Sequence, residues 1–190
     1  MLSKPEKILL YSNIIWNFGD GMFGPFFALF TQKIGGNLLD IAWAWAIYLF
    51  VTGFLIIVIG KFSDRGLNKA KLMIWGYALT AVCTFAYIFV SSPFELFIVQ
   101  AILGLAIALC NPTWYALYDK YSNPIHDGYT WGLSDGVVKM FGGLAILIGG
   151  VVIKFFSFEA LFVIIGVIQI ISTIYQIKIL RYEGKLVSVK

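Results

Sequence analysis

Long uninterrupted runs of apolar residues constrain this chain more than any other feature of its sequence. Six runs follow one another with short polar gaps between them, at about residues 8–31, 39–61, 70–91, 94–118, 130–155 and 159–180. Each run is close to the ~20 residues that an α-helix needs to cross about 30 Å of hydrocarbon. A transmembrane β-barrel would instead show alternating segments of about ten residues. The sequence therefore predicts an all-α integral membrane protein with six transmembrane helices in a single domain, residues 1–190.

The amino-acid composition agrees with a membrane protein. The chain is 60% hydrophobic and 13% charged, whereas soluble domains are about 45–50% apolar and about 25% charged. The runs occupy most of the 190 residues and leave no room for a soluble domain. The first run is too long for the apolar region of a signal peptide, and it contains Asn13, Asn17, Asp20 and Pro25.

Lysine and arginine residues in the gaps indicate the orientation of the chain, because cytoplasmic loops carry an excess of them. One side of the membrane would carry Lys33 and Lys154. The other side would carry Lys4, Lys7, Lys61, Arg65, Lys69, Lys71, Lys120, Lys178, Arg181, Lys185 and Lys190. We therefore expect both termini in the cytoplasm and the protein in the cell inner membrane. This bias also explains the net charge of +4, so no nucleic-acid partner is expected.

The first run carries polar residues at helical spacing. Asn13, Asn17, Asp20 and Gly24 are four, three and four residues apart, which places them on one face of a helix. A carboxylate at the bilayer centre costs about 2.5–3.5 kcal/mol on insertion scales, so it is expected to face the bundle interior or a wet cavity. Asp20 has no cation near it in the sequence, which favours a functional role over a structural one.

Later runs show related patterns. The fourth run has one face made of Gln100, Gly104, Ala108, Asn111 and Tyr115. In the fifth run Asp135 and Lys139 are one turn apart, which fits either a local ion pair or a role in a cavity. The sixth run carries a polar strip that this pattern does not explain, made of Gln169, Ser172, Thr173 and Gln176.

The loop after the second run, GKFSDRGLNKAK at residues 60–71, resembles the signature between the second and third helices of major facilitator superfamily transporters. Gly60, Asp64, Arg65 and Lys69 match that signature, whereas positions 67 and 68 depart from it. The resemblance implies a cytoplasmic gate built from these four residues together with Asp119.

Further segments match the same family in the same order. GLAIALCNPTWYALYD, residues 104–119, is similar to its fourth helix, and GYTWGLSDG, GGLAILIGG and FEALFVIIG are similar to its fifth helix and the start of its sixth. The ordered set covers nearly the whole chain and implies one half of the major facilitator fold. Gln100 stands where the family's fourth helix often has a proton-coupling arginine. Ala145 and Ile146 stand where its antiporters often have Gly-Pro, which weakens the interpretation as a drug antiporter.

The resemblance also implies roles for the polar residues. FGDG, residues 18–21, is loosely similar to the proton site in the first helix of the family's sugar–proton symporters. Asp20 is therefore expected to couple protons, with Asp135 and Lys139 setting its local field. A small polar solute, such as a sugar, is expected to be bound by Asn13, Trp16, Asn17, Gln100, Asn111 and Tyr115. Pro25 and Pro112 are expected to bend the two helices that contain them, and no cofactor or metal is expected.

The length of the chain bears on its assembly. The family has two six-helix halves related by an axis along the membrane normal, and this chain resembles one half. A half alone would present a polar face that lipid cannot satisfy, so a partner must cover it. Two copies in the same orientation can do so by twofold symmetry. We expect a parallel homodimer that works as a secondary active transporter by alternating access, and not an enzyme, with the first, second, fourth and fifth helices facing the partner.

Other possibilities stay open at this point. The chain could pair with a different six-helix protein, export a drug or amphiphile, or act as a membrane scaffold or receptor without transport. An intramembrane aspartyl protease is disfavoured, because FGD at residues 18–20 does not complete the G-x-G-D pattern that such an enzyme requires. The substrate, the coupling ion and the direction of transport are not fixed by the sequence.

Overall fold

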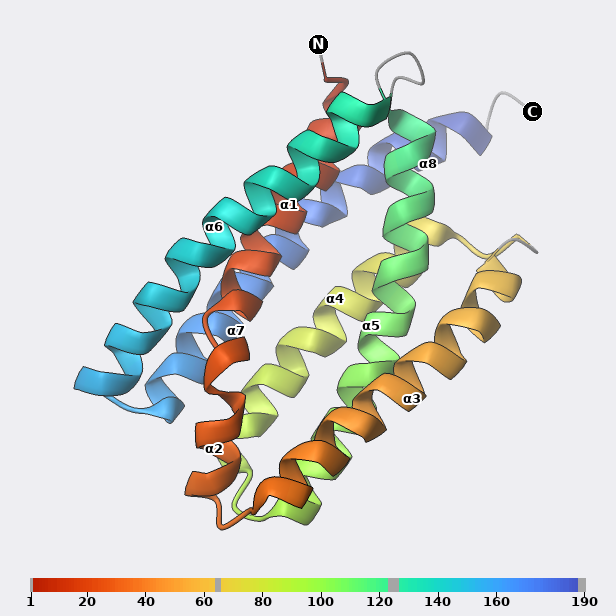
Figure 1. Cartoon of the computed structure of the whole chain (residues 1–190). Helices are drawn as coiled ribbons and strands as arrows, with labels where there is room; N and C mark the ends of the chain where they lie inside the picture. Colours follow the sequence, from red (N-terminus) through yellow and green to blue (C-terminus); the bar gives the residue numbers. More distant parts are fainter. Residues whose placement is uncertain (1, 64–65, 123–126, 188–190) are drawn as a thin grey trace.

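The computed structural model describes residues 2–63, 66–122 and 127–187, and within these ranges the chain is helical with short connections (Figure 1). The elements are α1 (Lys4–Gly21), η1 (Gly24–Phe26), α2 (Phe27–Lys33), α3 (Leu38–Ser63), α4 (Lys69–Ala86), η2 (Tyr87–Phe89), α5 (Pro93–Tyr121), α6 (Asp127–Phe155), α7 (Phe158–Gln176), η4 (Ile177–Ile179) and α8 (Leu180–Val187). The fold class expected from the sequence, an all-α membrane bundle, is therefore confirmed.

Five helices in the described ranges are long and apolar enough to cross a membrane. They are α3, α4 continued by η2, α5, α6, and α7 continued through η4 into α8. Serine caps begin two of them: Ser92 and Ser157 precede α5 and α7, and each side chain accepts a hydrogen bond from a backbone N–H three residues later. The apolar runs of the sequence thus match these helices to within a few residues.

The first run forms an interrupted helix instead of a continuous one. α1 ends at Gly21, the chain passes through η1 at Gly24–Phe26, and α2 continues to Lys33. Pro25 lies in this break, where its ring and its missing N–H are compatible with a helix start but not with a helix interior. The second proline has a different outcome, because α5 continues as an α-helix through Pro112 to Tyr121.

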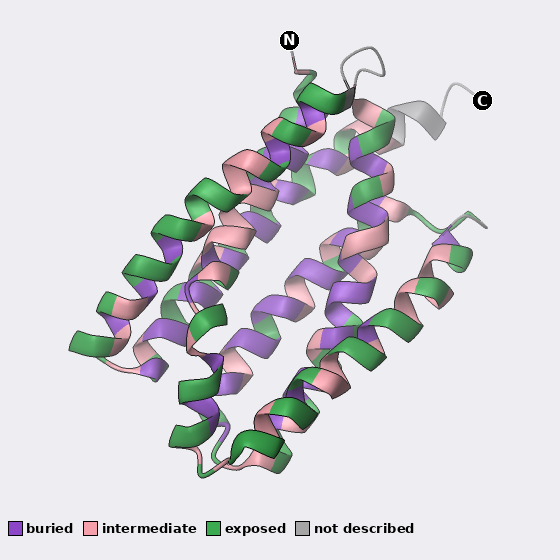
Figure 2. Cartoon of the chain, viewed as in Figure 1, coloured by how far each residue is buried: buried purple, intermediate pink, exposed green. Residues whose placement is uncertain are grey.

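The helices form two layers. We call α1, α3, α5 and α6 the open layer, and α4 and α7 the closed layer. In Figure 1, α3 and α6 lie at the two sides with α1 and α5 between them, and α4 and α7 lie behind. Only 11% of the α3 span and 17% of the α6 span are buried, against 44% for α4 and α5 and 39% for α7. Figure 2 shows the exposed residues that run along α3 and α6. The two flanking helices therefore leave much of their surface without a partner in a single chain.

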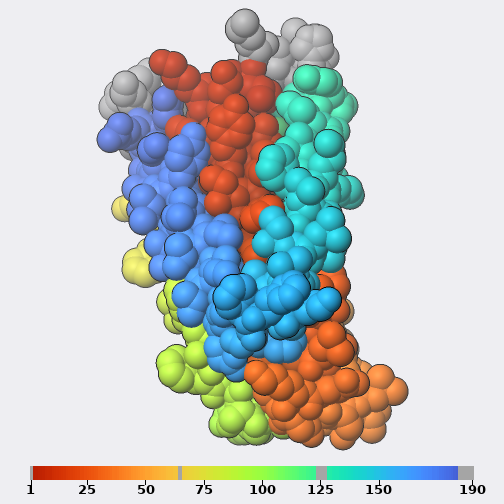
Figure 3. Space-filling view, turned by 90° about the vertical axis from the view of Figure 1, so that its left-hand side faces the viewer, coloured from red at the N-terminus to blue at the C-terminus, as the bar shows by residue number. Residues whose placement is uncertain are grey.

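Helix α1 lies between α6 and α7, as the strip of α1 on the surface in Figure 3 shows. Its contact with α6 is unusually close at the break. A Cβ atom added to Gly149 would lie 2.9 Å from the carbonyl carbon of Met22 and closer still to its oxygen. Glycine at position 149 therefore permits α6 to approach the backbone of the interrupted helix.

The polar strip of α7 lies inside the closed layer. Thr84 Oγ1 donates a hydrogen bond to Gln169 Oε1 at 2.7 Å, and Ser172 Oγ donates to the Ser12 carbonyl at 2.7 Å. Gln176 is fully buried beside Met73 of α4. These contacts join α7 to α4 and α1, so Gln169 and Ser172 of the strip serve interhelical hydrogen bonding, which membrane bundles use in place of the hydrophobic effect.

Aromatic rings close the bundle at the end where α1 is broken. The rings of Tyr87 and Phe162 stack with centroids 5.1 Å apart, and Phe23 packs edge-on against both. Phe30 from α2 contacts the same rings. At the opposite end, the start of α1 and α8 lie together (Figure 1). A second aromatic cluster, made of Trp114, Tyr118 and Trp131, joins α5 to α6 nearer the opposite end.

Candidate functional site

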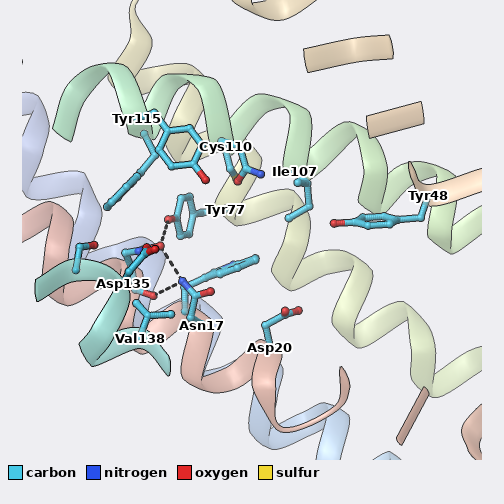
Figure 4. A pocket seen from close by; sticks show the side chains of 14 residues that line it. Asn17, Asp20, Tyr48, Tyr77, Ile107, Cys110, Tyr115, Asp135 and Val138 are labelled. Atoms are coloured by element: carbon cyan, nitrogen blue, oxygen red, sulfur yellow. Dashed lines mark hydrogen bonds between the residues drawn. The ribbon is translucent and has the colours of Figure 1, made fainter. Parts of the chain in front are cut away.

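A cavity of about 280 Å³ lies between α1 and α5 in the open layer (Figure 4). Its wall is made of Asn13, Trp16, Asn17, Asp20, Tyr48, Tyr77, Ile107, Cys110, Asn111, Trp114, Tyr115, Ser134, Asp135 and Val138. Tyr115 is 53% exposed and the side chain of Asp135 is 75% exposed, so the cavity reaches the surface of the single chain. A space of this size and composition fits a small solute that makes both polar and ring contacts.

The polar residues of α1 share hydrogen bonds with one another. Asn17 Nδ2 donates to the Asn13 carbonyl and to Asn13 Oδ1, both at 2.8 Å. The Tyr77 hydroxyl from α4 donates to the same Oδ1 at a longer 3.4 Å. The Trp16 ring packs edge-on against Tyr77 with centroids 5.5 Å apart. The spacing seen in the sequence thus places Asn13, Trp16 and Asn17 together on the cavity wall, held by α4.

Asp20 differs from the asparagines on its helix. It lies one residue before the end of α1, and its side chain points into the space beside Tyr48 (Figure 4). Among the residues that the structure describes, its carboxylate has no hydrogen bond and no ion pair. The sequence predicted a carboxylate without a local cation, and the fold brings no cation to it either.

The rest of the wall comes from α5, which lies across the cavity from α1, and from α6, which lies beside α1 (Figure 4). Asn111, Trp114 and Tyr115 line the cavity from α5, and Ser134 and Asp135 line it from α6. Two long helices bring these residues to α1, and α5 is more deeply buried than α6. Trp114 is buried and its Nε1 donates to the Leu9 carbonyl of α1 at 3.3 Å, which ties the two walls together.

The ion pair expected in the fifth run is present at the edge of this site. Lys139 Nζ lies 3.4 Å from Asp135 Oδ2, and the two side chains are 76% and 75% exposed. Asp135 lines the cavity, whereas Lys139 does not. The structure therefore joins Lys139 to Asp135 and not to Asp20.

Gln100 lies apart from the main cavity. It is 3% exposed and lines a second cavity of about 90 Å³ together with Asp20, Trp45, Tyr48 and Tyr87. The face expected on the fourth run is thus divided along α5. Gly104 packs against α3, where Thr52 Oγ1 donates to its carbonyl at 3.3 Å, and only the later residues reach the main cavity.

The residues expected to form a gate lie at helix ends. Gly60 is near the end of α3, Lys69 begins α4, and Asp119 is exposed near the end of α5. Asp64 and Arg65, the central pair of the motif, lie outside the described residues.

Several wall residues were not expected from the sequence: Tyr48, Tyr77, Cys110, Trp114 and Ser134. Two of them are tyrosines within apolar helices, and a phenol hydroxyl in such a run is a usable signal because it needs a polar partner. Within the described part of the chain, no group of three or more histidine, cysteine or acidic residues is placed to hold a metal ion.

The chain and its fold are similar to known proteins. Residues 9–185 match the family model described as Major Facilitator Superfamily. The uncharacterized MFS-type transporter YitZ of Bacillus subtilis (strain 168) is 22% identical over 164 residues, which cover 85% of this chain and 98% of YitZ. The multidrug resistance protein MdtG of Enterobacter lignolyticus (strain SCF1) is 21% identical over 189 residues, covering 96% of this chain and 45% of MdtG.

A solved structure has the same arrangement of helices. The POT family transporter PepTSo, crystallised in meso, aligns with a TM-score of 0.71 and 11% identity over 93% of this chain and 37% of that one. The chain thus spans nearly all of YitZ but about half of MdtG. The match over residues 9–185, together with this fold, identifies the chain as a multi-pass membrane protein that belongs to the Major Facilitator Superfamily.

Proposed function

We propose that this protein is a proton-coupled secondary active transporter that moves a small polar solute across the cell inner membrane by alternating access. The observation that carries the proposal is the cavity of about 280 Å³, whose wall combines amides, hydroxyls, aromatic rings and the carboxylate of Asp20. Asn13, Trp16, Asn17, Asn111 and Tyr115 would contact the solute there. Gln100 would act from the second cavity.

A second copy of the chain would complete the site. The cavity opens on the face flanked by α3 and α6, and a polar cavity cannot face lipid. A parallel homodimer would cover it with the same face of its partner, as twofold symmetry requires. The length of MdtG, about twice that of the matched region, supports a pair of such units as the working form. A different six-helix protein as the partner is the alternative that the same face allows.

Proton coupling would act through Asp20. Protonation removes the cost of an unpaired carboxylate in a low-dielectric site, so proton occupancy can favour one of two states of the transporter. The other titratable groups on the wall are Asp135, Tyr48, Tyr77, Cys110 and Tyr115. Asp135 is paired with Lys139, whereas the Asp20 carboxylate has no partner within the described residues.

We also propose a cytoplasmic gate and an orientation of the chain in the membrane. Gly60, Asp64, Arg65, Lys69 and Asp119 would act at the cytoplasmic ends of their helices, with both termini on the same side of the membrane. A drug or amphiphile exporter is a second candidate, which the multidrug resistance proteins among the relatives favour.

Proteoliposomes that contain this chain alone test the proposal. Labelled lactose and labelled acetylcholine would be offered with and without a pH gradient across the membrane. We expect one of them to accumulate only with the gradient, and a protonophore should abolish that accumulation. Correctly inserted, dimeric protein that moves neither probe in response to the gradient would contradict the proposal.

Cysteine crosslinking tests the assembly. The native Cys83 and Cys110 are buried and would be replaced by serine or alanine first. Single cysteines at the exposed positions Phe54 of α3 and Met140 of α6 should crosslink with α3 and α6 positions of the partner. Cysteines at Trp75 of α4 and Ile174 of α7 are matched controls of similar exposure. Crosslinks that form mainly through the control positions would refute this dimer.

A further inference from the structure

Asp20 lies where three cavities meet. The main cavity has a volume of about 280 Å³, the second about 90 Å³, and a third, between α1, α4 and α7, about 30 Å³. Within the described part of the chain, Asp20 is the one residue that lines all three of them. Any solute that fills either of the larger cavities therefore comes close to this carboxylate.

The walls of these three cavities carry acidic side chains but, among the residues that the structure describes, no lysine, arginine or histidine. Asp135 has Lys139 at 3.4 Å, whereas the Asp20 carboxylate has neither a hydrogen bond nor an ion pair within the described ranges. An anionic solute would meet an unpaired carboxylate, and a neutral solute would leave it unpaired. A cation would neutralise it.

The break at the end of α1 adds to the negative potential in these cavities. Asp20 lies in the last turn of α1, which ends at Gly21 before the chain turns through η1. The C-terminal end of a helix carries a partial negative charge, and the C-terminal ends of interrupted membrane helices bind cations in transporters. The backbone and the side chain at this point therefore both favour a positive charge in the cavity.

Much of the wall of the second cavity is aromatic. The second cavity is lined by the rings of Phe23, Phe27, Trp45, Tyr48 and Tyr87 beside Asp20. Ring faces attract cations, most effectively when the cation is weakly hydrated. A hard inorganic cation needs a shell of oxygen ligands, which these rings do not supply. The composition thus favours a charged nitrogen that carries carbon substituents.

We infer that the solute of this transporter is an organic cation, whose charged nitrogen binds beside Asp20 against the aromatic wall of the second cavity while its body occupies the main cavity. This inference rests on the proposed function, because it names the class of solute for the same site. It replaces the uncharged sugar that the family resemblance implied. Gln100 and the tyrosine hydroxyls would then orient the polar atoms of the cation.

Calorimetric titration of the full chain in lipid nanodiscs tests the inference with two ligands of nearly equal shape. Acetylcholine carries a quaternary nitrogen, and its carbon isostere dimethylbutyl acetate is uncharged. We expect acetylcholine to bind at least about tenfold more tightly, the ratio that corresponds to about 1.4 kcal/mol. Equal affinities, or tighter binding of lactose or of sodium ion than of acetylcholine, would overturn the inference. This comparison uses the unmodified chain.

Two variants locate the site. Asp20→Asn should weaken acetylcholine binding at least about tenfold and leave the weak binding of dimethylbutyl acetate unchanged. Asp40→Asn, the same chemical change at the start of α3 and away from the three cavities, should alter neither affinity. Unchanged acetylcholine binding in Asp20→Asn would overturn the inference.

The two proposals fail in different ways. Gradient-driven transport of lactose without binding of acetylcholine would overturn the organic cation and keep the transporter. Charge-selective binding of acetylcholine through Asp20, without transport of either probe, would keep the cation site and overturn the transporter.

Discussion

Gln100 and Gln169 are two buried glutamines whose surroundings show how the two layers of this bundle differ. They are 3% and 1% exposed, and both lie within membrane-spanning helices. Gln169 lies in the closed layer, where Thr84 donates a hydrogen bond to its Oε1 at 2.7 Å. Gln100 lies in the open layer, has no hydrogen bond within the described residues, and lines the second cavity of about 90 Å³, whereas Gln169 borders the third cavity of about 30 Å³. Burial alone therefore does not distinguish a polar residue that holds helices together from one that is available to a solute.

Asp20 and Ser172 show the same difference between an unpaired and a hydrogen-bonded polar side chain. Ser172 is fully buried and bonds to the α1 backbone at 2.7 Å, whereas Asp20 is exposed to three cavities and unpaired. A polar group in a membrane helix is costly unless it is satisfied. In the closed layer other helices satisfy Gln169 and Ser172, and for Asp20 in the open layer we expect the solute, protons or a second copy to do so.

The largest expected effect is the loss of coupling in Asp20→Asn. Asparagine cannot exchange a proton, so the variant should still exchange solute between two pools but should not accumulate it. A gradient of one pH unit stores about 1.4 kcal/mol, enough for about tenfold accumulation with one proton per solute, and the variant should show none. Labelled uptake and counterflow in proteoliposomes measure the two activities. Accumulation at the wild-type level would show that Asp20 does not couple protons.

The second effect concerns the contact between α6 and the break in α1. Gly149→Ala places a Cβ against the Met22 carbonyl and should destabilise the chain by about 1–3 kcal/mol, as overpacking does. Gly143→Ala is the control on the same helix, because a Cβ there meets nothing within 4 Å. Its effect should stay within about 1 kcal/mol, the difference in helix propensity. Denaturant unfolding in mixed micelles compares the two variants, and equal losses would contradict the close approach of α6 to α1.

The smallest effect is expected at the rim of the closed layer. Lys33 Nζ lies 2.7 Å from Glu159 Oε1 and joins α2 to the start of α7, but the side chains are 47% and 49% exposed. Exposed ion pairs contribute at most about 1 kcal/mol, since solvent screens them. Lys33→Ala should therefore lower the free energy of unfolding by less than that amount and leave transport unchanged. A larger loss would mean that this contact is buried in the working assembly.

The sequence predicts the helices well because membrane spans depend on length and apolarity. Five runs match five helices within a few residues. The first run differs, since Pro25 and its neighbouring glycines interrupt the helix that hydrophobicity alone would continue. Periodicity also places Asn13, Asn17 and Asp20 on one wall, because their spacing fixes their face before any tertiary contact forms.

The rest of the site depends on tertiary packing, which a single sequence does not encode locally. Tyr77 joins the wall because α4 packs beside α5 and its hydroxyl reaches Asn13. The spacing of Asp135 and Lys139 fits either a local pair or a role in the cavity, and the fold shows the local pair at 3.4 Å. The strip on α7 gave the same signal as that on α1, and its hydrogen bonds to α1 and α4 became visible only in the fold.

The most direct test of this account measures two properties in each of two variants. Gln169→Leu should lower the free energy of unfolding by about 0.6–1.7 kcal/mol, the range for hydrogen bonds in membrane bundles, and leave gradient-driven uptake per folded protein unchanged. Gln100→Leu should leave unfolding unchanged and reduce uptake several-fold. If Gln169→Leu impaired uptake and Gln100→Leu impaired stability, or if both variants lost both properties together, the division into a closed structural layer and an open solute layer would be wrong.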